Sequence, residues 1–446
     1  MQNESTPRAV SLAAAGVFLA SCGAATVVEA PRAPQPPASL EPAATSVSQA
    51  DPVRLLQAEL DAGTTVLAFD SLLGYLPALL AELQIPASSQ TLVFSRTSLQ
   101  TDRIGPWAPR ALYFNDDVYV GWVQDSPFME LASMDPRSGA KFYTMTQRPE
   151  DPLRFRRETT TCLLCHDSRA TEQVPGLIMR STLADRLGYP VTGFHSGSSS
   201  DATPMESRWG GWYVTGSHGS MTHAGNLRAE ELFEDIPSPD RYITELDRAS
   251  SSNQSDLSDH FDVTQYLTPH SDITALMVLT HQVRLHNLMS VVQSQKGRFL
   301  GTMASQNGGL EFSLESSGGS ATGALDRLLR TMMFVDEAPL TDRVQGNSEF
   351  ATEFPALGPF DGQGRSLRDF DLETRLFRYP VSFLIYSESF DALPGVARNY
   401  IYDGIAELLT VETLPDSYSR LEEVDRAAVF EVLRETKPEF AERVTR

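Results

Sequence analysis

The chain has 446 residues, 41% of them hydrophobic, which is enough for two or three domains with a sizeable core and excludes global disorder. Its formal net charge is −22, a value that does not change if the first 21 residues are removed, and such an acidic surface excludes nucleic acid as a partner. The charge instead favours a partner protein with a basic docking face. With only three cysteines, the chain is not a disulfide-stapled scaffold.

The N-terminal apolar run Ala9–Ala20 is too short to span a bilayer and is typical of the h-region of a secretory signal. It ends in Leu19-Ala20-Ser21-Cys22-Gly23, which resembles the lipobox of bacterial lipoproteins. The resemblance implies that Cys22 is acylated and becomes the mature N-terminus; an ordinary signal peptide with a chance cysteine is the alternative. Gly23 lacks the acidic character of an inner-membrane retention signal. We therefore expect an outer-membrane lipoprotein, held to the membrane by its lipid anchor only and facing the periplasm or the cell surface.

After Cys22 the chain is rich in Pro, Ala and Ser up to Ala50, a composition that predicts an extended tether. Folding is expected to begin near Asp51. Residues 51–83 are expected to be mostly helical, with interruptions at Gly63 and Pro77.

Residues 91–147 contain short runs of β-branched and aromatic residues and are predicted to be β-rich. Between two of these runs, Asn115-Asp116-Asp117 predicts a hairpin turn. The predicted strands are Leu92–Phe94, Ala111–Phe114, Val118–Val120 and Phe142–Thr144.

Cys162-Leu163-Leu164-Cys165-His166 is a C-x-x-C-H sequence, the attachment signature of c-type haem. Two residues between the thiols place both sulfurs along one edge of the porphyrin, where each can form a thioether with a vinyl group. His166 would then lie under the iron as its proximal ligand. Because haem c is attached outside the cytoplasm, the export signal supports this interpretation. The sequence predicts one covalent haem c on Cys162, Cys165 and His166.

Other interpretations of the cysteine pair fit the sequence less well. A zinc site needs about four ligands, and the chain has no second cysteine pair. A thioredoxin-type dithiol belongs at a strand-to-helix junction of a βαβ unit, which the pattern does not show. Arg154, Arg156 and Arg157 precede the motif; they either pair with haem propionates or form a solvated basic turn.

The sixth iron ligand decides the function, because Met or His there gives a closed electron-transfer centre, whereas an open position allows peroxide or oxygen chemistry. The richest segment for such a ligand is Arg208–Asn226, which holds glycines, Trp209 and Trp212. A packed loop with a tryptophan pair in the core is the alternative. The candidate distal ligands are His218, Met221 and His223, with Met179 and Met205 as further candidates.

Ser271–Val292 is the clearest helix, capped by Ser271 or Asp272 and expected to bury one face. His281 and His286 on it are five residues apart, so they do not share a face and are predicted to be separate core or surface histidines. The C-terminal part is predicted to be mostly helical. The face expected to be buried in the last helix consists of Val424, Ala428, Val429, Val432 and Leu433.

The chain resembles bacterial mono-haem c-type cytochrome lipoproteins, and more narrowly large exported proteins with a cytochrome c domain. The resemblance implies Cys162 and Cys165 as thioether positions and His166 as proximal ligand. Small cytochromes c are far shorter, and di-haem peroxidases carry two C-x-x-C-H motifs where this chain has one. Four segments carry the resemblance: Ala111–Gly121, the C-x-x-C-H region, Arg208–Gly219 and Arg375–Pro394.

We therefore expect an α+β fold, with mainly helical haem-bearing and C-terminal parts and a β-rich segment before the haem motif. The expected function is electron transfer in the cell envelope through one covalent haem c. The alternatives are a mono-haem peroxidase or oxygenase, with His218 or His223 as acid–base, and a haem-based sensor or binding protein. The expected parts are a signal peptide (1–21), a tether (22–50), a helix plus β-rich region (51–150), a haem-binding region (151–310) and a helical C-terminal region (311–446).

Overall fold

The computed structural model describes residues 51–191, 197–229, 252–297, 312, 322–421 and 424–445. The predicted signal peptide, lipidated Cys22 and tether lie outside these residues. Within them, helices and an antiparallel sheet are both present, as the sequence predicts, and no helix is long and apolar enough to cross a membrane.

The first half of the described chain forms a six-stranded antiparallel sheet in which every strand pairs with its neighbours in sequence. Asn115 makes the predicted hairpin turn, because its side-chain oxygen accepts hydrogen bonds from Asp117 N (3.1 Å) and Val118 N (2.9 Å). Two of the strands, β4 and β6, were not among the predicted runs. The strands are β1 (Thr91–Val93), β2 (Arg110–Phe114), β3 (Val118–Trp122), β4 (Phe128–Asp135), β5 (Gly139–Thr146) and β6 (Phe155–Glu158).

Both faces of this sheet are buried, and alternate residues face two different hydrophobic clusters. One face, with Tyr113 and Val120, packs with α1 (Pro52–Ala62) and α2 (Leu76–Glu82). Helix α1 ends at Gly63 in a left-handed cap, as predicted. Pro77 was expected to interrupt a helix, but it lies in the first turn of α2, where its missing N–H costs nothing.

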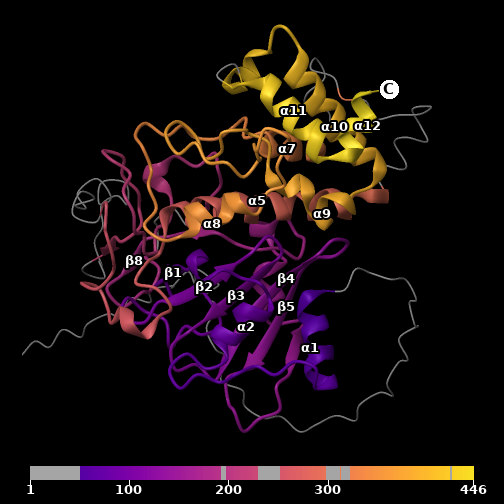
Figure 1. Cartoon of the computed structure of the whole chain (residues 1–446). Helices are drawn as coiled ribbons and strands as arrows, with labels where there is room; N and C mark the ends of the chain where they lie inside the picture. The colour runs from indigo at the N-terminus through magenta and orange to yellow at the C-terminus, as the bar shows by residue number, and fades with distance from the viewer. Residues whose placement is uncertain are drawn as a thin grey trace, which may run out of the picture. The chain divides into compact units, whose positions relative to one another are not determined.

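The other face of the sheet, which includes Phe114 and Phe142, is covered by α5 (Ile273–Ser294). Figure 1 shows α5 between the sheet and the C-terminal helices. This helix was expected to bury one face, but it is buried on nearly every side because layers pack on both flanks. Asp272 caps it, accepting hydrogen bonds from Thr274 N (2.8 Å) and Ala275 N (3.1 Å).

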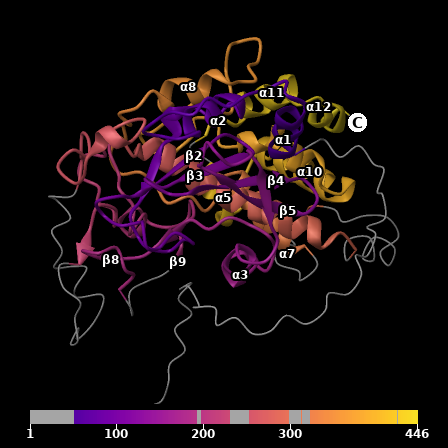
Figure 2. The ribbon, with the colours of Figure 1, turned by 90° about the horizontal axis from the view of Figure 1, so that it is seen from below.

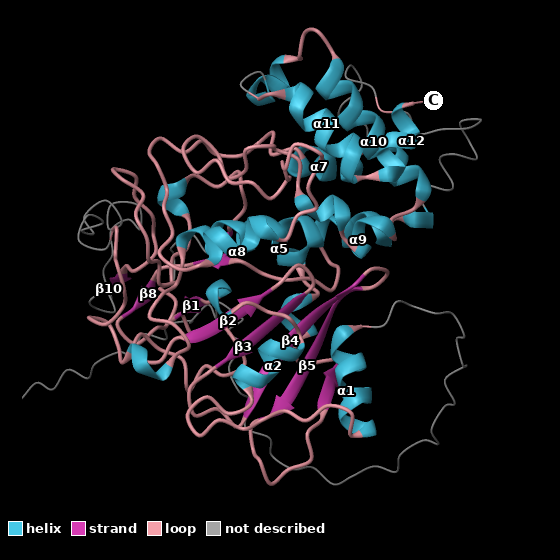
Figure 3. Cartoon of the chain, viewed as in Figure 1, coloured by secondary structure: helices cyan, strands magenta, loops and turns pink. Residues whose placement is uncertain are grey.

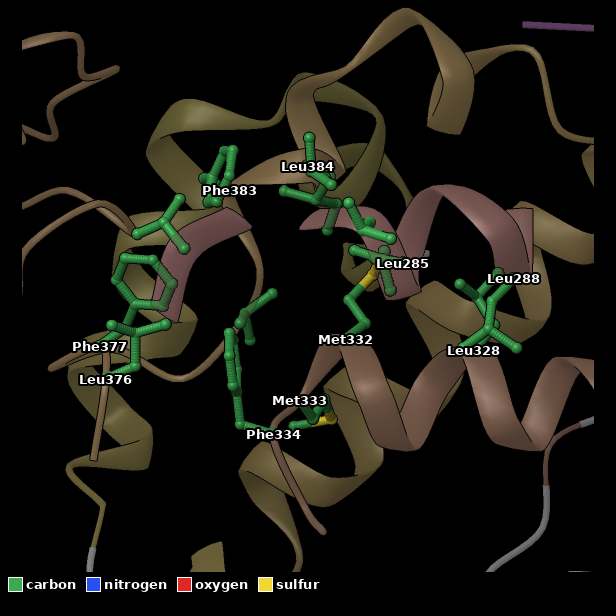
Figure 4. Close-up of a cluster of buried hydrophobic side chains, with 14 of the residues drawn as sticks. Leu285, Leu288, Leu328, Met332, Met333, Phe334, Leu376, Phe377, Phe383 and Leu384 are labelled. Atoms are coloured by element: carbon green, nitrogen blue, oxygen red, sulfur yellow. The ribbon is translucent and has the colours of Figure 1, made fainter. Parts of the chain in front are cut away.

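The described C-terminal part contains the helices given at the end of this paragraph, separated by loops, and its core is continuous with α5. Figure 4 shows Leu285 and Leu288 of α5 meeting Leu328 and Met332 of α7 beside Leu384. Ala428, Val429, Val432 and Leu433 of the predicted apolar face lie on α11, whereas Val424 precedes this helix. A further helix, α12, follows α11. The helices are α7 (Gly323–Met332), α8 (Phe350–Ala356), α9 (Glu388–Asp391), α10 (Gly395–Thr410), α11 (Arg426–Thr436) and α12 (Pro438–Val444).

Between the sheet and α5, the described chain consists mainly of loops and two-residue strand pairs (Figure 3). Its helical structure there is limited to the four-residue α3 (Leu163–His166) and short 3-10 turns. In the described part of residues 151–310, helix is therefore concentrated in α5. Glycines and polar turn residues dominate the segment before α5, and they favour loops over regular elements.

Candidate haem-attachment site

The C-x-x-C-H motif forms a single helical turn directly after the edge strand β6. Cys162 begins the turn, and its carbonyl accepts a hydrogen bond from His166 N (3.0 Å). Cys162 and Leu163 pack against the main core, whereas Leu164 is 79% exposed. Cys162 carries a free thiol. Burial raises the pKa of the Cys162 thiol to about 11, and Glu130 and Glu158 add to the rise.

His166 is held in one orientation by the chain that follows it. Its Nδ1 lies 2.9 Å from the carbonyl oxygen of Gly176, and because a carbonyl only accepts, Nδ1 carries the proton. The imidazole packs against Phe142 of β5, with ring centroids 4.6 Å apart. Burial, with the charges of Arg110 and Arg180, lowers the pKa of His166 to about 4, although the hydrogen bond to Gly176 opposes the shift. At neutral pH the ring is therefore uncharged, with the lone pair on Nε2.

Arg110 of β2 brings a cation to the same face of the sheet. Its guanidinium lies across Gly121 of β3, so close that a Cβ at Gly121 would be 2.3 Å from Arg110 Nη2. One guanidinium nitrogen is 2.8 Å from Glu130, whereas the buried Nε has no hydrogen-bond partner. Arg110 therefore has one unused N–H donor beside the motif.

The three arginines that precede the motif are placed differently from one another. Arg154 pairs with Asp61 of α1, and Arg157 stacks 5.3 Å from the ring of Tyr143 on the opposite face of the sheet. Arg156 is 3.5 Å from Glu158, and its side chain is 79% exposed. Of these three arginines, Arg156 is the one that is exposed to solvent on the face of the sheet that carries the motif.

The glycine-rich part of Arg208–Asn226 packs against protein backbone. Gly210 lies so close to Thr182 that a Cβ would be 3.0 Å from the Thr182 backbone. Trp209 Nε1 donates to Thr280 of α5 (3.1 Å), and Trp212 Nε1 donates to the carbonyl of Arg180 (2.7 Å). These contacts match the packed-loop alternative for the tryptophan pair. They also bring Trp212 to Arg180, whose charge acts on His166.

The structure gathers the three candidate distal ligands in a cluster of their own. His218 and His223 have ring centroids 4.8 Å apart. His218 N donates to Asn253 Oδ1 (2.6 Å), and the sulfur of Met221 accepts from Thr341 N (3.4 Å). Met179 and Met205 are buried in the main core. The candidates thus lie together, but the contacts of His218 and Met221 run to residues 253 and 341 and do not reach α3.

His281 and His286 are both fully buried, as separate core histidines. His281 Nδ1 lies 2.7 Å from Asp201 Oδ2, and its Nε2 lies 2.8 Å from Ser382 Oγ. This Ser–His–Asp chain has the connectivity of a hydrolase triad. However, His281 and Ser382 are both 0% exposed, so a substrate has no approach to the hydroxyl and the chain is a buried polar network of the core. His286 Nε2 lies 2.8 Å from the carbonyl of Asp116.

Sequence reasoning identified the motif but not the residues that surround it. Phe142, Gly176 and Arg110 approach His166 only through the fold of the sheet and the loop behind α3. The one local signal was Pro175-Gly176, a turn-forming pair shortly after the motif. In the described part of the chain, no group of three or more His, Cys, Asp or Glu side chains is arranged to hold a metal ion by itself.

Comparison with known proteins gives no further guidance. No family model, no curated protein and no solved structure matches the chain.

Proposed function

We propose that the protein is a c-type cytochrome that carries one haem, attached through Cys162 and Cys165 with His166 as the proximal iron ligand. The observation that carries the proposal is the hydrogen bond between His166 Nδ1 and the Gly176 carbonyl. An iron-ligating histidine needs a neutral ring with one nitrogen free and the other fixed by an outer hydrogen bond. His166 meets both requirements, and burial, with the charges of Arg110 and Arg180, keeps it neutral by lowering its pKa.

The surroundings of the motif also suit the peripheral groups of a haem. Haem propionates are carboxylates, and the exposed guanidinium of Arg156, on the motif's face of the sheet, is a suitable donor for one of them. Leu164 and Arg156 are exposed on the outer side of the turn, so a bound haem would have room there. When bound, the haem supplies an iron that exchanges single electrons.

Each protein residue has a limited task in this proposal. Cys162 and Cys165 would anchor the group through thioether bonds. Gly176 would fix the orientation of His166, and Phe142 would exclude water from one side of the imidazole. The acidic chain would dock on a basic partner.

We further propose that the protein acts in the cell envelope, held there by the lipid predicted on Cys22. Haem attachment through thioethers suits a protein that could otherwise lose its cofactor by dilution outside the cytoplasm.

The proposal is tested by expressing the full chain with its own leader in a bacterial host that attaches haem c. We expect haem that survives denaturation and an intact mass increased by one haem. Cys162→Ser should reduce attachment to a single thioether or abolish it, whereas Ser168→Ala, beside the motif, should load fully. A protein that carries no covalent haem in a host that matures a control cytochrome contradicts the proposal.

Absorption spectra then distinguish electron transfer from catalysis. Low-spin spectra that do not change with carbon monoxide or peroxide support electron transfer. A high-spin spectrum that shifts with carbon monoxide would instead favour a peroxidase, an oxygenase or a haem sensor.

A further inference from the structure

The chain that follows the C-x-x-C-H motif returns to it at Gly176. Gly176 N donates to the carbonyl of His166 (2.8 Å), and His166 Nδ1 donates to the carbonyl of Gly176 (2.9 Å). Figure 2 shows α3 beside β5, whose Phe142 contacts the His166 ring. Because both hydrogen bonds end on one residue, the position of Gly176 decides how the imidazole is oriented.

Asn287 of α5 binds the residue next to Gly176. Its Oδ1 accepts from Leu177 N (2.9 Å), and its Nδ2 donates to the Leu177 carbonyl (2.8 Å). Each atom of the amide thus faces a partner of fixed kind, so the side chain has a single orientation. Asn287 and Leu177 are both buried, so water has little access to replace these hydrogen bonds.

The Asn287 amide also packs directly on Gly176. A Cβ at Gly176 would lie 2.3 Å from Asn287 Oδ1, so the amide occupies the space that a side chain would take. On the other flank, the carbonyl of Pro175 accepts from Ala140 N near the start of β5 (2.8 Å). The segment Pro175-Gly176-Leu177 is therefore held between β5 and α5.

A second attachment of the same loop to α5 lies nearer the surface. Glu172 pairs with Arg284 of α5 (2.6 Å) and with Arg327 of α7 (2.7 Å), and its side chain is 28% exposed. Solvent-accessible ion pairs contribute little to stability, typically about 0–1 kcal/mol. Asn287, in contrast, is buried and touches Gly176 itself. Of these two attachments, Asn287 is therefore the one that sets the position of Gly176.

We propose that Asn287 is a positioning residue for His166, which acts through Leu177 and Gly176 to keep the Nδ1 proton on the Gly176 carbonyl. Nε2 is then left as the iron-binding nitrogen, so the inference rests on the haem function proposed above. A hydrogen bond on the outer nitrogen makes a histidine a more basic ligand, and a more basic ligand favours oxidised iron. Asn287 would thus lower the reduction potential of the haem without touching it.

The first test needs no haem. In the haem-free full-length protein labelled with nitrogen-15 at histidine, nuclear magnetic resonance reports which ring nitrogen of His166 carries the proton at neutral pH. The His166→Gln variant assigns the signal, and we expect the Nδ1–H form in the wild type. Asn287→Leu keeps the approximate size of the side chain but removes both hydrogen bonds. The ratio of the Nδ1–H form to the Nε2–H form should therefore fall at least tenfold.

Thr280→Val provides the matched control. Thr280 is a fully buried polar residue of the same helix, and its hydroxyl accepts from Trp209 Nε1 (3.1 Å), so it serves a different loop. This variant should keep the wild-type tautomer. Gly176→Ala tests the contact from the loop side, because its methyl group would strike Asn287 Oδ1. It should shift the tautomer even if Asn287→Leu fails to fold. A wild-type tautomer in Asn287→Leu or Gly176→Ala, or an equal shift in Thr280→Val, overturns the proposal.

The second test is a redox titration of the haem-loaded protein. Asn287→Leu should raise the equilibrium constant for reduction about tenfold, equivalent to about 59 mV for a one-electron couple. Thr280→Val should change this constant by less than about threefold. A tautomer shift without a change in potential would overturn the role of Asn287 at the iron. If the chain carries no covalent haem, the proposed haem function fails, whereas the nitrogen-15 measurement still decides whether Asn287 orients His166.

Discussion

Glu337 is a buried residue near Asp201, which belongs to the buried Ser382–His281–Asp201 network. Its oxygen accepts a hydrogen bond from Leu376 N (2.9 Å). Burial and the nearby carboxyl of Asp201 raise the pKa of Glu337 to about 7, while the Leu376 hydrogen bond and the charges of Arg208 and Arg375 oppose the rise. Since the side chain keeps its proton in the folded state but not in the unfolded chain, its ionisation opposes folding above about pH 5.

The raised pKa of Glu337 predicts how the free energy of unfolding depends on pH. As pH rises from about 4.5 to about 7, the unfolded chain loses the proton while the folded protein retains it, so the free energy of unfolding falls. Glu337→Gln removes this loss and should gain stability relative to the wild type by roughly 3 kcal/mol between pH 4 and pH 8. Urea denaturation at several pH values measures the difference. A stability difference that stays constant across this range would contradict the assignment.

At the residue scale, sequence patterns identified chemistry only where it is local. The C-x-x-C-H motif and the Asn115 turn are each complete within a few residues, so their spacing alone identifies them. The Ser382–His281–Asp201 chain joins residues from three distant segments, and nothing local marks them as neighbours. The His166–Gly176 hydrogen bond likewise depends on how a loop without regular structure returns to the motif.

At the scale of elements, the cap of α5 also organises a loop from the C-terminal half. Besides the two helix N–H groups, the Asp272 carboxylate accepts from Asn347 N (2.8 Å) and Ser348 N (2.8 Å). A buried carboxylate with these donors satisfies four backbone groups at once. We expect Asp272→Ala to lower the free energy of unfolding by about 3 kcal/mol or more, because the buried donors lose a charged acceptor.

Asp425→Ala provides the matched control for that variant. Asp425 caps α11 at the surface and accepts from Ala428 N alone (3.0 Å). Its removal should cost about 1 kcal/mol, as an ordinary exposed cap does. Chemical denaturation of both variants gives the comparison. Equal losses would show that the contacts of Asp272 to residues 347 and 348 contribute nothing.

Elements could be predicted where local propensity and tertiary context agree. Strands β2 and β3 are rich in aromatic and β-branched residues and were found. Strand β4 contains Met, Glu, Ala and Ser, so its strand form depends on hydrogen bonding between β3 and β5. The position and cap of α5 followed from its sequence, but its burial on nearly every side follows from the layers on both flanks.

At the scale of the whole molecule, α5 couples the sheet to the C-terminal helices. Because both layers pack on it, its backbone becomes accessible only when they separate. We expect the amides of α5 to exchange hydrogen with the slowest rate in the protein, at the free energy of global unfolding. The amides of α12, near the C-terminus, should exchange faster. Hydrogen exchange followed by mass spectrometry tests this, and early exchange in α5 would contradict the coupling.

The order of the strands has a consequence for how the chain folds as it emerges. Strands β1 to β6 pair in sequence order, so the sheet can form from local contacts early and quickly. The helix that covers its second face, α5, begins at Ile273, long after β6 ends at Glu158. Until α5 has been synthesised, the sheet face that includes Phe114 and Phe142 therefore stays uncovered, at risk of aggregation. The C-x-x-C-H motif emerges within that interval, so an enzyme that attaches the proposed haem would meet a half-folded chain with the turn of the motif still unpacked.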